Sequence, residues 1–280
     1  MANLKKEQLL GSNFHYSRFS FSYFLDAMER LGTRRIELWA ASPHFYVDDY
    51  DVGSMLALRK ELRKRKIEIA CFTPEQCIYP INIAANESEV RERSIRYFEK
   101  TLECAAVLDA PLVQITAGRG NRDANPDDVY GRSVESILRL TRKAESYGIT
   151  FVLEATSEYT SHVNTTEQIR RMIDDVGSSS FSGMLDVCQV ANANEDMLED
   201  LQLLGDDMRH LHFADGTPLG HFVPGDGKGH LPLEDYMRAL DEFGYQHGIS
   251  LEIYNKIYDF DPVHYSQMCK EYIFEQIDRL

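Results

Sequence analysis

The stretch FVLEA, residues 151–155, is an apolar run that places one charged side chain, Glu154, at its end. Three later apolar runs have the same form: FSGMLDV (181–187) with Asp186, MRHLHFAD (208–215) with His212, and ISLEIY (249–254) with Glu252. A charge that ends a buried run is costly unless it is paired or binds a metal. The four residues follow one another at spacings of 32, 26 and 40, which suit strand–helix units with their loops. The pattern predicts one site built at the ends of parallel strands.

The rest of the chain repeats the alternation of short apolar runs and amphipathic segments. The expected strands are 9–14, 35–39, 67–72, 112–117, 149–154, 181–187, 210–214 and 249–253. The expected helices are 22–31, 52–66, 88–108, 127–147, 165–176, 195–204, 233–243 and 262–279, several of them followed by glycine. This order predicts an α/β fold, a (β/α)8 TIM barrel, as a single domain over residues 1–280. A doubly wound open sheet is the alternative, but HYSRFS (15–20) is not the glycine-rich turn expected after its first strand.

Composition restricts the possible functions. The 280 residues are 43% hydrophobic, which allows a large core without covalent cross-links. A formal net charge of −15 argues against nucleic acid as a partner and is compatible with a cationic small molecule. The five cysteines form no CxxC motif, and no long apolar segment or signal peptide is visible. We therefore expect a cytoplasmic protein with reduced thiols and no membrane partner.

The four strand-end residues form a mostly hard ligand set, suited to Mn²⁺, Mg²⁺, Co²⁺ or Zn²⁺. Active sites of such barrels lie at the carboxyl ends of the strands. Each residue alone has an ordinary explanation, because a strand-end glutamate can pair with an arginine and a buried histidine can be part of the core. The joint pattern favours a metal site. We interpret His210 and Glu37 as supporting groups behind it and Cys188 as a small buried apolar residue.

Several motifs carry a family resemblance over essentially the whole chain. They are IELW (36–39) with PH (43–44), TPE (73–75), HLHFAD (210–215) and VPGDGKGHLPL (223–233). These segments resemble the xylose-isomerase-like family of sugar isomerases and epimerases, and within it the ketose 3-epimerases. The resemblance implies one divalent metal ion (Mn, Co, Mg, Zn or Ni) held by Glu154, Asp186, His212 and Glu252. It also implies that Glu154 and Glu252 act as the acid and base that invert C3 through an enediolate.

The substrate end departs from the tagatose-type pattern. Gln189 stands where those enzymes carry a histidine, Thr160 where they carry a glutamate, and His221 where they carry an arginine. FTPEQCIYPIN (72–82) and LDVCQV (185–190) are similar to the branch that epimerises fructoselysine. The best candidate reaction is therefore fructoselysine to psicoselysine, although another ketose also fits. The candidate substrate-binding residues are His221, Gln189, Glu158, Glu75 and His44.

The residue pattern leaves other functions open. An aldose–ketose isomerase or a sugar-acid dehydratase would use the same metal site, because all these reactions remove a proton beside a carbonyl. A nuclease of the endonuclease IV branch needs many more histidine ligands than this pattern offers. A non-catalytic sugar-binding barrel is disfavoured by the complete ligand set. We expect a small sugar or sugar–amine as partner, and a homo-oligomer is possible.

Overall fold

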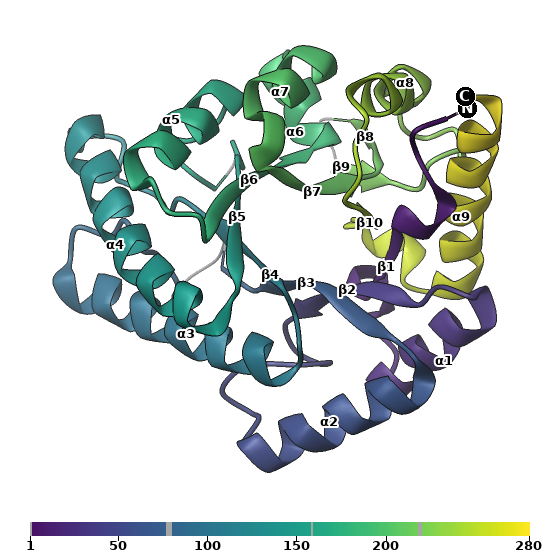
Figure 1. The fold of residues 1–280 in the computed structure, drawn as a ribbon, viewed down its shortest axis with the longest axis horizontal. Helices are drawn as coiled ribbons and strands as arrows, with labels where there is room; N and C mark the ends of the chain where they lie inside the picture. Colours follow the sequence, from purple (N-terminus) through teal and green to yellow (C-terminus); the bar gives the residue numbers. More distant parts are fainter. Residues whose placement is uncertain (1, 77–79, 158, 218–219) are drawn as a thin grey trace.

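The computed structural model describes residues 2–76, 80–157, 159–217 and 220–280. Eight parallel strands within these ranges close into a barrel in the order β1-β10-β7-β6-β5-β4-β3-β2 (Figure 1). The barrel strands are β1 (Leu9–Ser12), β2 (Arg35–Ala40), β3 (Glu68–Pro74), β4 (Leu112–Thr116), β5 (Thr150–Glu154), β6 (Phe181–Asp186), β7 (Met208–Phe213) and β10 (Gly248–Leu251). The predicted (β/α)8 barrel is confirmed. The single-domain organisation stays a prediction.

Helices surround the barrel (Figure 1). They are α1 (Phe21–Leu31), α2 (Val52–Arg65), α3 (Ser88–Val107), α4 (Pro126–Tyr147), α5 (Thr166–Val176), α6 (Val187–Ala193), α7 (Met197–Leu204), α8 (Leu233–Phe243) and α9 (Pro262–Arg279). Local sequence sets their ends. For example, Asn125 caps the start of α4 through its side chain, and Gly148 ends that helix at φ 66°. No helix in the described ranges has the length and apolar character needed to cross a membrane.

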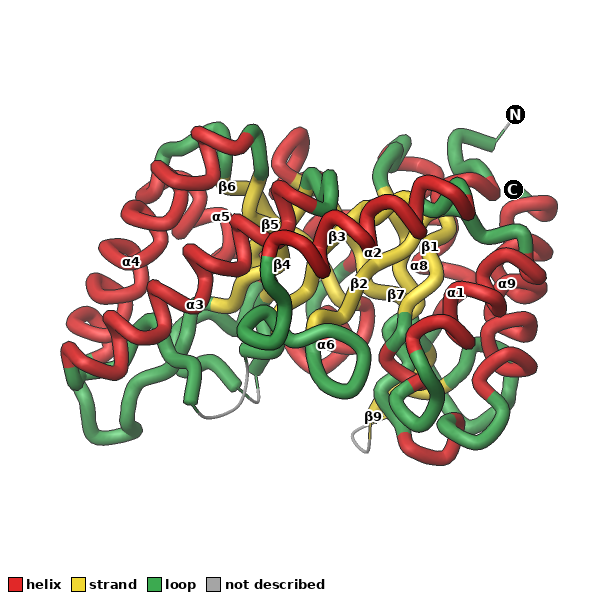
Figure 2. The backbone as a smooth tube through the Cα atoms, turned by 90° about the horizontal axis from the view of Figure 1, so that it is seen from below, coloured by secondary structure: helices red, strands yellow, loops and turns green. Residues whose placement is uncertain are grey.

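Three of the differences from the expected elements lie close to the site. Strand β1 stops at Ser12 because the amide of Asn13 takes over the pairing: its Oδ1 accepts from Trp39 N at 2.7 Å, and its Nδ2 donates to Trp39 O at 3.0 Å. Strand β6 stops at Asp186 because that carboxylate caps α6, which the sequence did not indicate. A short antiparallel hairpin, β8 (Asp215–Thr217) and β9 (Gly220–Phe222), follows β7. Figure 2 shows β9 and α6 toward the same side of the barrel.

The barrel interior changes character along its axis. Cys71, Val152 and Met184 form a small apolar cluster inside it. Side chains two residues further along a strand point the same way, so Glu154 follows Val152 and Asp186 follows Met184 toward the carboxyl ends. In register, Met184 lies beside His210 and Asp186 beside His212. On β5 and β6, an apolar side chain inside the barrel is therefore followed by a carboxylate at the rim, which is where the site lies.

Candidate active site

The structure brings the four predicted ligands together at the carboxyl ends of β5, β6, β7 and β10. Their donor atoms all lie within 4.8 Å of one another. His212 Nδ1 is 3.3 Å from Glu154 Oε1, 3.3 Å from Glu252 Oε2 and 3.9 Å from Asp186 Oδ2. Glu154, Asp186 and His212 are buried, while the side chain of Glu252 is 16% exposed. The cluster is therefore nearly dry and opens on one side.

The hydrogen-bond roles of His212 fit a metal ion at this cluster. Its Nε2 lies 2.9 Å from Glu37 Oε1, and an ionised carboxylate can only accept, so the proton belongs on Nε2. Nδ1 faces the carboxylates and has no hydrogen-bond partner among the described residues. Burial alone would lower the pKa of His212, but in the metal-free protein the charges of Glu37 and Glu252 raise it well above its usual value. A bound cation would take the place of the proton on Nδ1. Three carboxylates gathered in a water-poor site need a positive charge. Both observations suit a divalent cation.

Glu37 supports the cluster from inside the barrel. It is fully buried and accepts hydrogen bonds from His210 Nε2 at 2.7 Å, His212 Nε2 at 2.9 Å and Thr73 Oγ1 at 2.5 Å. Burial alone would raise the pKa of this carboxyl, but the charges of His212 and His210 hold it well below its usual range. Glu37 therefore stays ionised and fixes the orientation of both rings.

The acidic groups of the cluster differ in proton affinity. Burial raises the pKa of Glu154 to about 7, against the opposing influence of His212. Burial would also raise the pKa of Asp186, but His221, His212 and the backbone N–H of Gln189 bring it to about 2. Without a bound cation, Glu154 is the carboxyl poised to exchange a proton near neutral pH, whereas Asp186 stays ionised.

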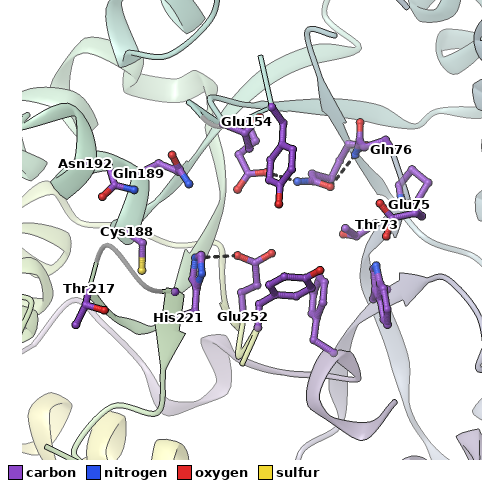
Figure 3. Close-up of a pocket in the computed structure, with 18 residues that line it drawn as sticks. Thr73, Glu75, Gln76, Glu154, Cys188, Gln189, Asn192, Thr217, His221 and Glu252 are labelled. Atoms are coloured by element: carbon purple, nitrogen blue, oxygen red, sulfur yellow. Dashed lines mark hydrogen bonds and ion pairs between the residues drawn. The ribbon is translucent and has the colours of Figure 1, made fainter. Parts of the chain in front are cut away.

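A cavity of about 320 Å³ lies over this cluster. Its described lining consists of Phe14, Trp39, Thr73, Pro74, Glu75, Gln76, Gln114, Glu154, Thr156, Tyr159, Cys188, Gln189, Asn192, Thr217, Gly220, His221, Glu252 and Tyr254. Figure 3 shows Glu154 and Glu252 facing each other across the middle of the pocket, with Gln189 and His221 on one side and Glu75 on the other. A small molecule in this space would touch both glutamates.

A family model described as "Xylose isomerase-like TIM barrel" matches residues 25–267. The chain belongs to that family. Fructoselysine 3-epimerase of Escherichia coli O157:H7 is 28% identical to it over 251 residues, which are 89% of this chain and 90% of the relative. The resemblance seen in the sequence is thereby confirmed.

Solved structures place the fold among the same xylose isomerase-like barrels. A D-psicose 3-epimerase crystallised in the presence of D-fructose superposes with a TM-score of 0.79 at 18% identity, covering 95% of this chain and 96% of the other. The IOLI protein with a binding zinc atom superposes with a TM-score of 0.81 at 18% identity, covering 97% and 98%. The named relatives of this xylose isomerase-like chain support an isomerase.

The predicted substrate contacts of this family member have different outcomes. His221, Gln189 and Glu75 line the cavity. His221 Nε2 lies 3.2 Å from Asp186 Oδ2 and 3.3 Å from Glu252 Oε2, so it reaches the cluster itself. Asp186 raises the pKa of His221 well above its usual value, although burial acts in the opposite direction. Glu158 lies outside the described residues.

His44 does not line the cavity, so the structure gives no support to its prediction as a substrate contact. The residue is buried, its Nδ1 lies 2.8 Å from Asn13 Nδ2, and its Nε2 donates to Phe19 O at 2.8 Å. Both ring nitrogens are thus engaged by the loop after β1. Thr160 is also buried, and its hydroxyl donates to Val163 O at 2.6 Å.

Two glutamines at the site were not predicted. Gln114 on β4 donates from Nε2 to Glu154 Oε2, and Gln76, just after β3, donates to Gln114 Oε1 at 2.8 Å. The sequence held a weak signal, because Gln114 is a polar residue inside the buried strand LVQIT. A polar residue at an inward-facing position of a barrel strand needs a partner inside the barrel.

Proposed function

We propose that this protein is a divalent-metal-dependent 3-epimerase of a ketose or ketosamine, with fructoselysine as the first candidate substrate. The observation that carries the proposal is the pair Glu154 and Glu252, which face each other across the cavity (Figure 3). Their oxygens each lie 3.3 Å from the same nitrogen, His212 Nδ1. Inversion at carbon requires a base on one face and an acid on the other, each within hydrogen-bond reach of the substrate.

Glu154, Asp186, His212 and Glu252 would hold the metal ion, and the mostly hard donor set suits Mn²⁺, Co²⁺, Mg²⁺, Zn²⁺ or Ni²⁺. When bound, such an ion polarises a carbonyl and stabilises the negative charge that develops beside it. The zinc atom named in the structure of the IOLI protein supports a cation in this family.

The proton-transfer roles follow from the environment of each side chain. Glu154, which lines the cavity, exchanges a proton with C3 from one face of the substrate. Glu252 serves the opposite face, and the two roles exchange in the reverse reaction. Asp186 moves no proton, because it does not line the cavity and its Oδ1 accepts from Gln189 N at 2.8 Å. His212 keeps its proton on the nitrogen that Glu37 engages.

The lining suggests what kind of sugar enters. Among the described lining residues there is no lysine or arginine, so a phosphorylated sugar would meet no guanidinium or ammonium group there. Glu75 lies across the pocket from His221 (Figure 3) and is our candidate contact for an ammonium group of a ketosamine. The match to fructoselysine 3-epimerase supports this choice. A homo-oligomer and a cytoplasmic location stay predictions from the sequence.

The test is solvent deuterium incorporation followed by NMR. Fructoselysine, psicose, tagatose and a ketose 6-phosphate are each incubated in deuterated water with the protein loaded with Mn²⁺ or Co²⁺. The metal ion is removed before the NMR spectra are recorded. Label at C3 of an unphosphorylated compound is the expected result. Label at C1 would instead identify an aldose–ketose isomerase. Absence of label from every compound would contradict the proposal.

A further inference from the structure

We infer that Gln76 and Gln114 are positioning residues that form a one-way amide relay onto Glu154. The relay fixes one carboxylate oxygen of Glu154 and leaves the other for the cluster. The inference rests on the proposed function only for the catalytic role of Glu154. The relay itself is inferred from the directions of the hydrogen bonds. Nothing in the family match assigns a role to either glutamine.

The direction of the relay is set by a backbone group. Thr116 N–H can only donate, and it lies 2.7 Å from Gln76 Oε1, so this oxygen must accept. The nitrogen of Gln76 then points away from Thr116 and donates to Gln114 Oε1 at 2.8 Å. The nitrogen of Gln114 is left facing Glu154 Oε2 and donates to it. Amide orientation is often ambiguous, but here each step determines the next.

The relay crosses three neighbouring strands at the level of the site. It begins at the end of β4, passes through Gln76 after β3, returns to β4 and ends on β5. Gln76, Gln114 and Glu154 are each 5% exposed or less. Hydrogen bonds in such a water-poor setting are electrostatically stronger than at the surface. Figure 3 shows the bond from Gln76 and the side chain of Glu154 turned toward the pocket.

As a consequence, the two carboxylate oxygens of Glu154 have different partners. Oε2 is held by Gln114, while Oε1 lies 3.3 Å from His212 Nδ1. A carboxylate held at one oxygen cannot rotate freely. Its other oxygen therefore stays directed toward the cluster and the substrate above it. A misplacement of about 1 Å in a reacting group can cost about 10²-fold in rate. The relay therefore holds the Glu154 carboxylate in the position that the reaction needs.

Gln76→Glu tests the direction of the relay without touching Glu154. The new carboxylate still accepts from Thr116 N–H, but its second oxygen can no longer donate to Gln114 Oε1. Gln114 must then turn its amide, which places an oxygen against Glu154 Oε2. Gln114→Leu removes the same donor directly. We expect both variants to bind Mn²⁺ about 10-fold more weakly, as when an outer-shell partner of a ligand is lost.

Metal affinity is measured by counting free Mn²⁺ with electron paramagnetic resonance, so this arm needs no substrate. The charge added by Gln76→Glu would on its own attract a cation, and a fall in affinity therefore reports amide reversal. Asn192→Leu is the matched control, since it removes a cavity-lining amide outside the relay and should leave the affinity unchanged. Thermal melts verify that each variant folds.

Turnover supplies the second readout. With an active ketose, both relay variants should lower kcat by about 10²-fold with little change in KM, and the double variant should be no worse than Gln114→Leu alone. Additive losses, a rise in KM with kcat unchanged, or wild-type Mn²⁺ affinity in Gln76→Glu would overturn the relay. If no ketose reacts with the wild-type protein, the proposed function fails while the metal-affinity arm still decides the relay.

Discussion

Glu37→Gln should weaken metal binding, although Glu37 is not one of the four proposed ligands. Glu37 Oε1 accepts from Thr73 and His212, and Oε2 accepts from His210. A glutamine can accept at only one of these two ends. If its nitrogen faces His212, the imidazole proton must move to Nδ1, which removes the lone pair that faces the cluster.

The other orientation of the glutamine amide has the smaller effect and sets the lower bound of the expected loss in metal affinity. If the amide nitrogen faces His210, that ring must change tautomer, and His212 then donates to a neutral oxygen in place of a carboxylate. Loss of such an outer-shell partner costs about 10- to 100-fold in metal affinity, which corresponds to about 1.4 to 2.7 kcal/mol. We expect the dissociation constant for Mn²⁺ to rise within this range.

The assay is titration of metal-stripped protein with Mn²⁺, with free ion counted by electron paramagnetic resonance. Thr73→Val is the control, because it removes the third hydrogen bond to Glu37 and leaves both histidine contacts in place. Its affinity should stay close to that of the wild type. Wild-type affinity in Glu37→Gln, or an equal loss in Thr73→Val, would refute the claim that Glu37 acts by orienting His212.

Three further outcomes are expected. Glu154→Gln should lower deuterium exchange at C3 by at least about 10²-fold without lowering the Tm of the metal-free protein; an active variant would remove Glu154 from its proposed role. Chelation should lower the Tm, and Mn²⁺ at 100 times its Kd should raise the free energy of unfolding by about 2.7 kcal/mol. A Tm that does not change with metal would contradict the proposed metal site. The folded-state pKa of Glu154 in the absence of metal, about 7, lies above its ordinary 4.5. Its contribution to stability is therefore full below about pH 4.5 and is lost as pH rises through about 7. Urea unfolding of metal-free protein should show this loss in the wild type and not in Glu154→Gln, and parallel pH profiles would count against it.

The sequence predicted the barrel and the cluster because both depend on local order. Strand and helix lengths repeat along the chain, and side chains alternate strictly within a strand. The alternation alone thus assigned Glu154 to the same face of its strand as Val152. The predicted end of β6 was one residue too late, because Asp186 also caps α6, a role that a strand pattern does not reveal.

Contacts across the barrel were harder to predict. That Gln76 meets Gln114, and that Glu37 serves two histidines of β7, depends on side chains from different strands meeting in the interior. Periodicity indicates which face a residue occupies but not which neighbour it finds there. His44 shows the same limit for loops, since the loop after β2 turns its imidazole toward Asn13 and away from the cavity.

Asp186 links the proposed metal site to the proposed substrate-binding residues. Its Oδ2 lies 3.2 Å from His221 Nε2, while its Oδ1 caps the helix that carries Gln189. Gln189, which stands where tagatose-type enzymes carry a histidine, turns its Oε1 toward Ser157 Oγ at 3.0 Å. Gln189 thus lines the cavity next to His221 while its side-chain oxygen is held by Ser157. The same carboxylate that belongs to the cluster thus caps the helix that carries Gln189. Under the proposed function, this contact couples the metal site to the residues proposed to bind the sugar.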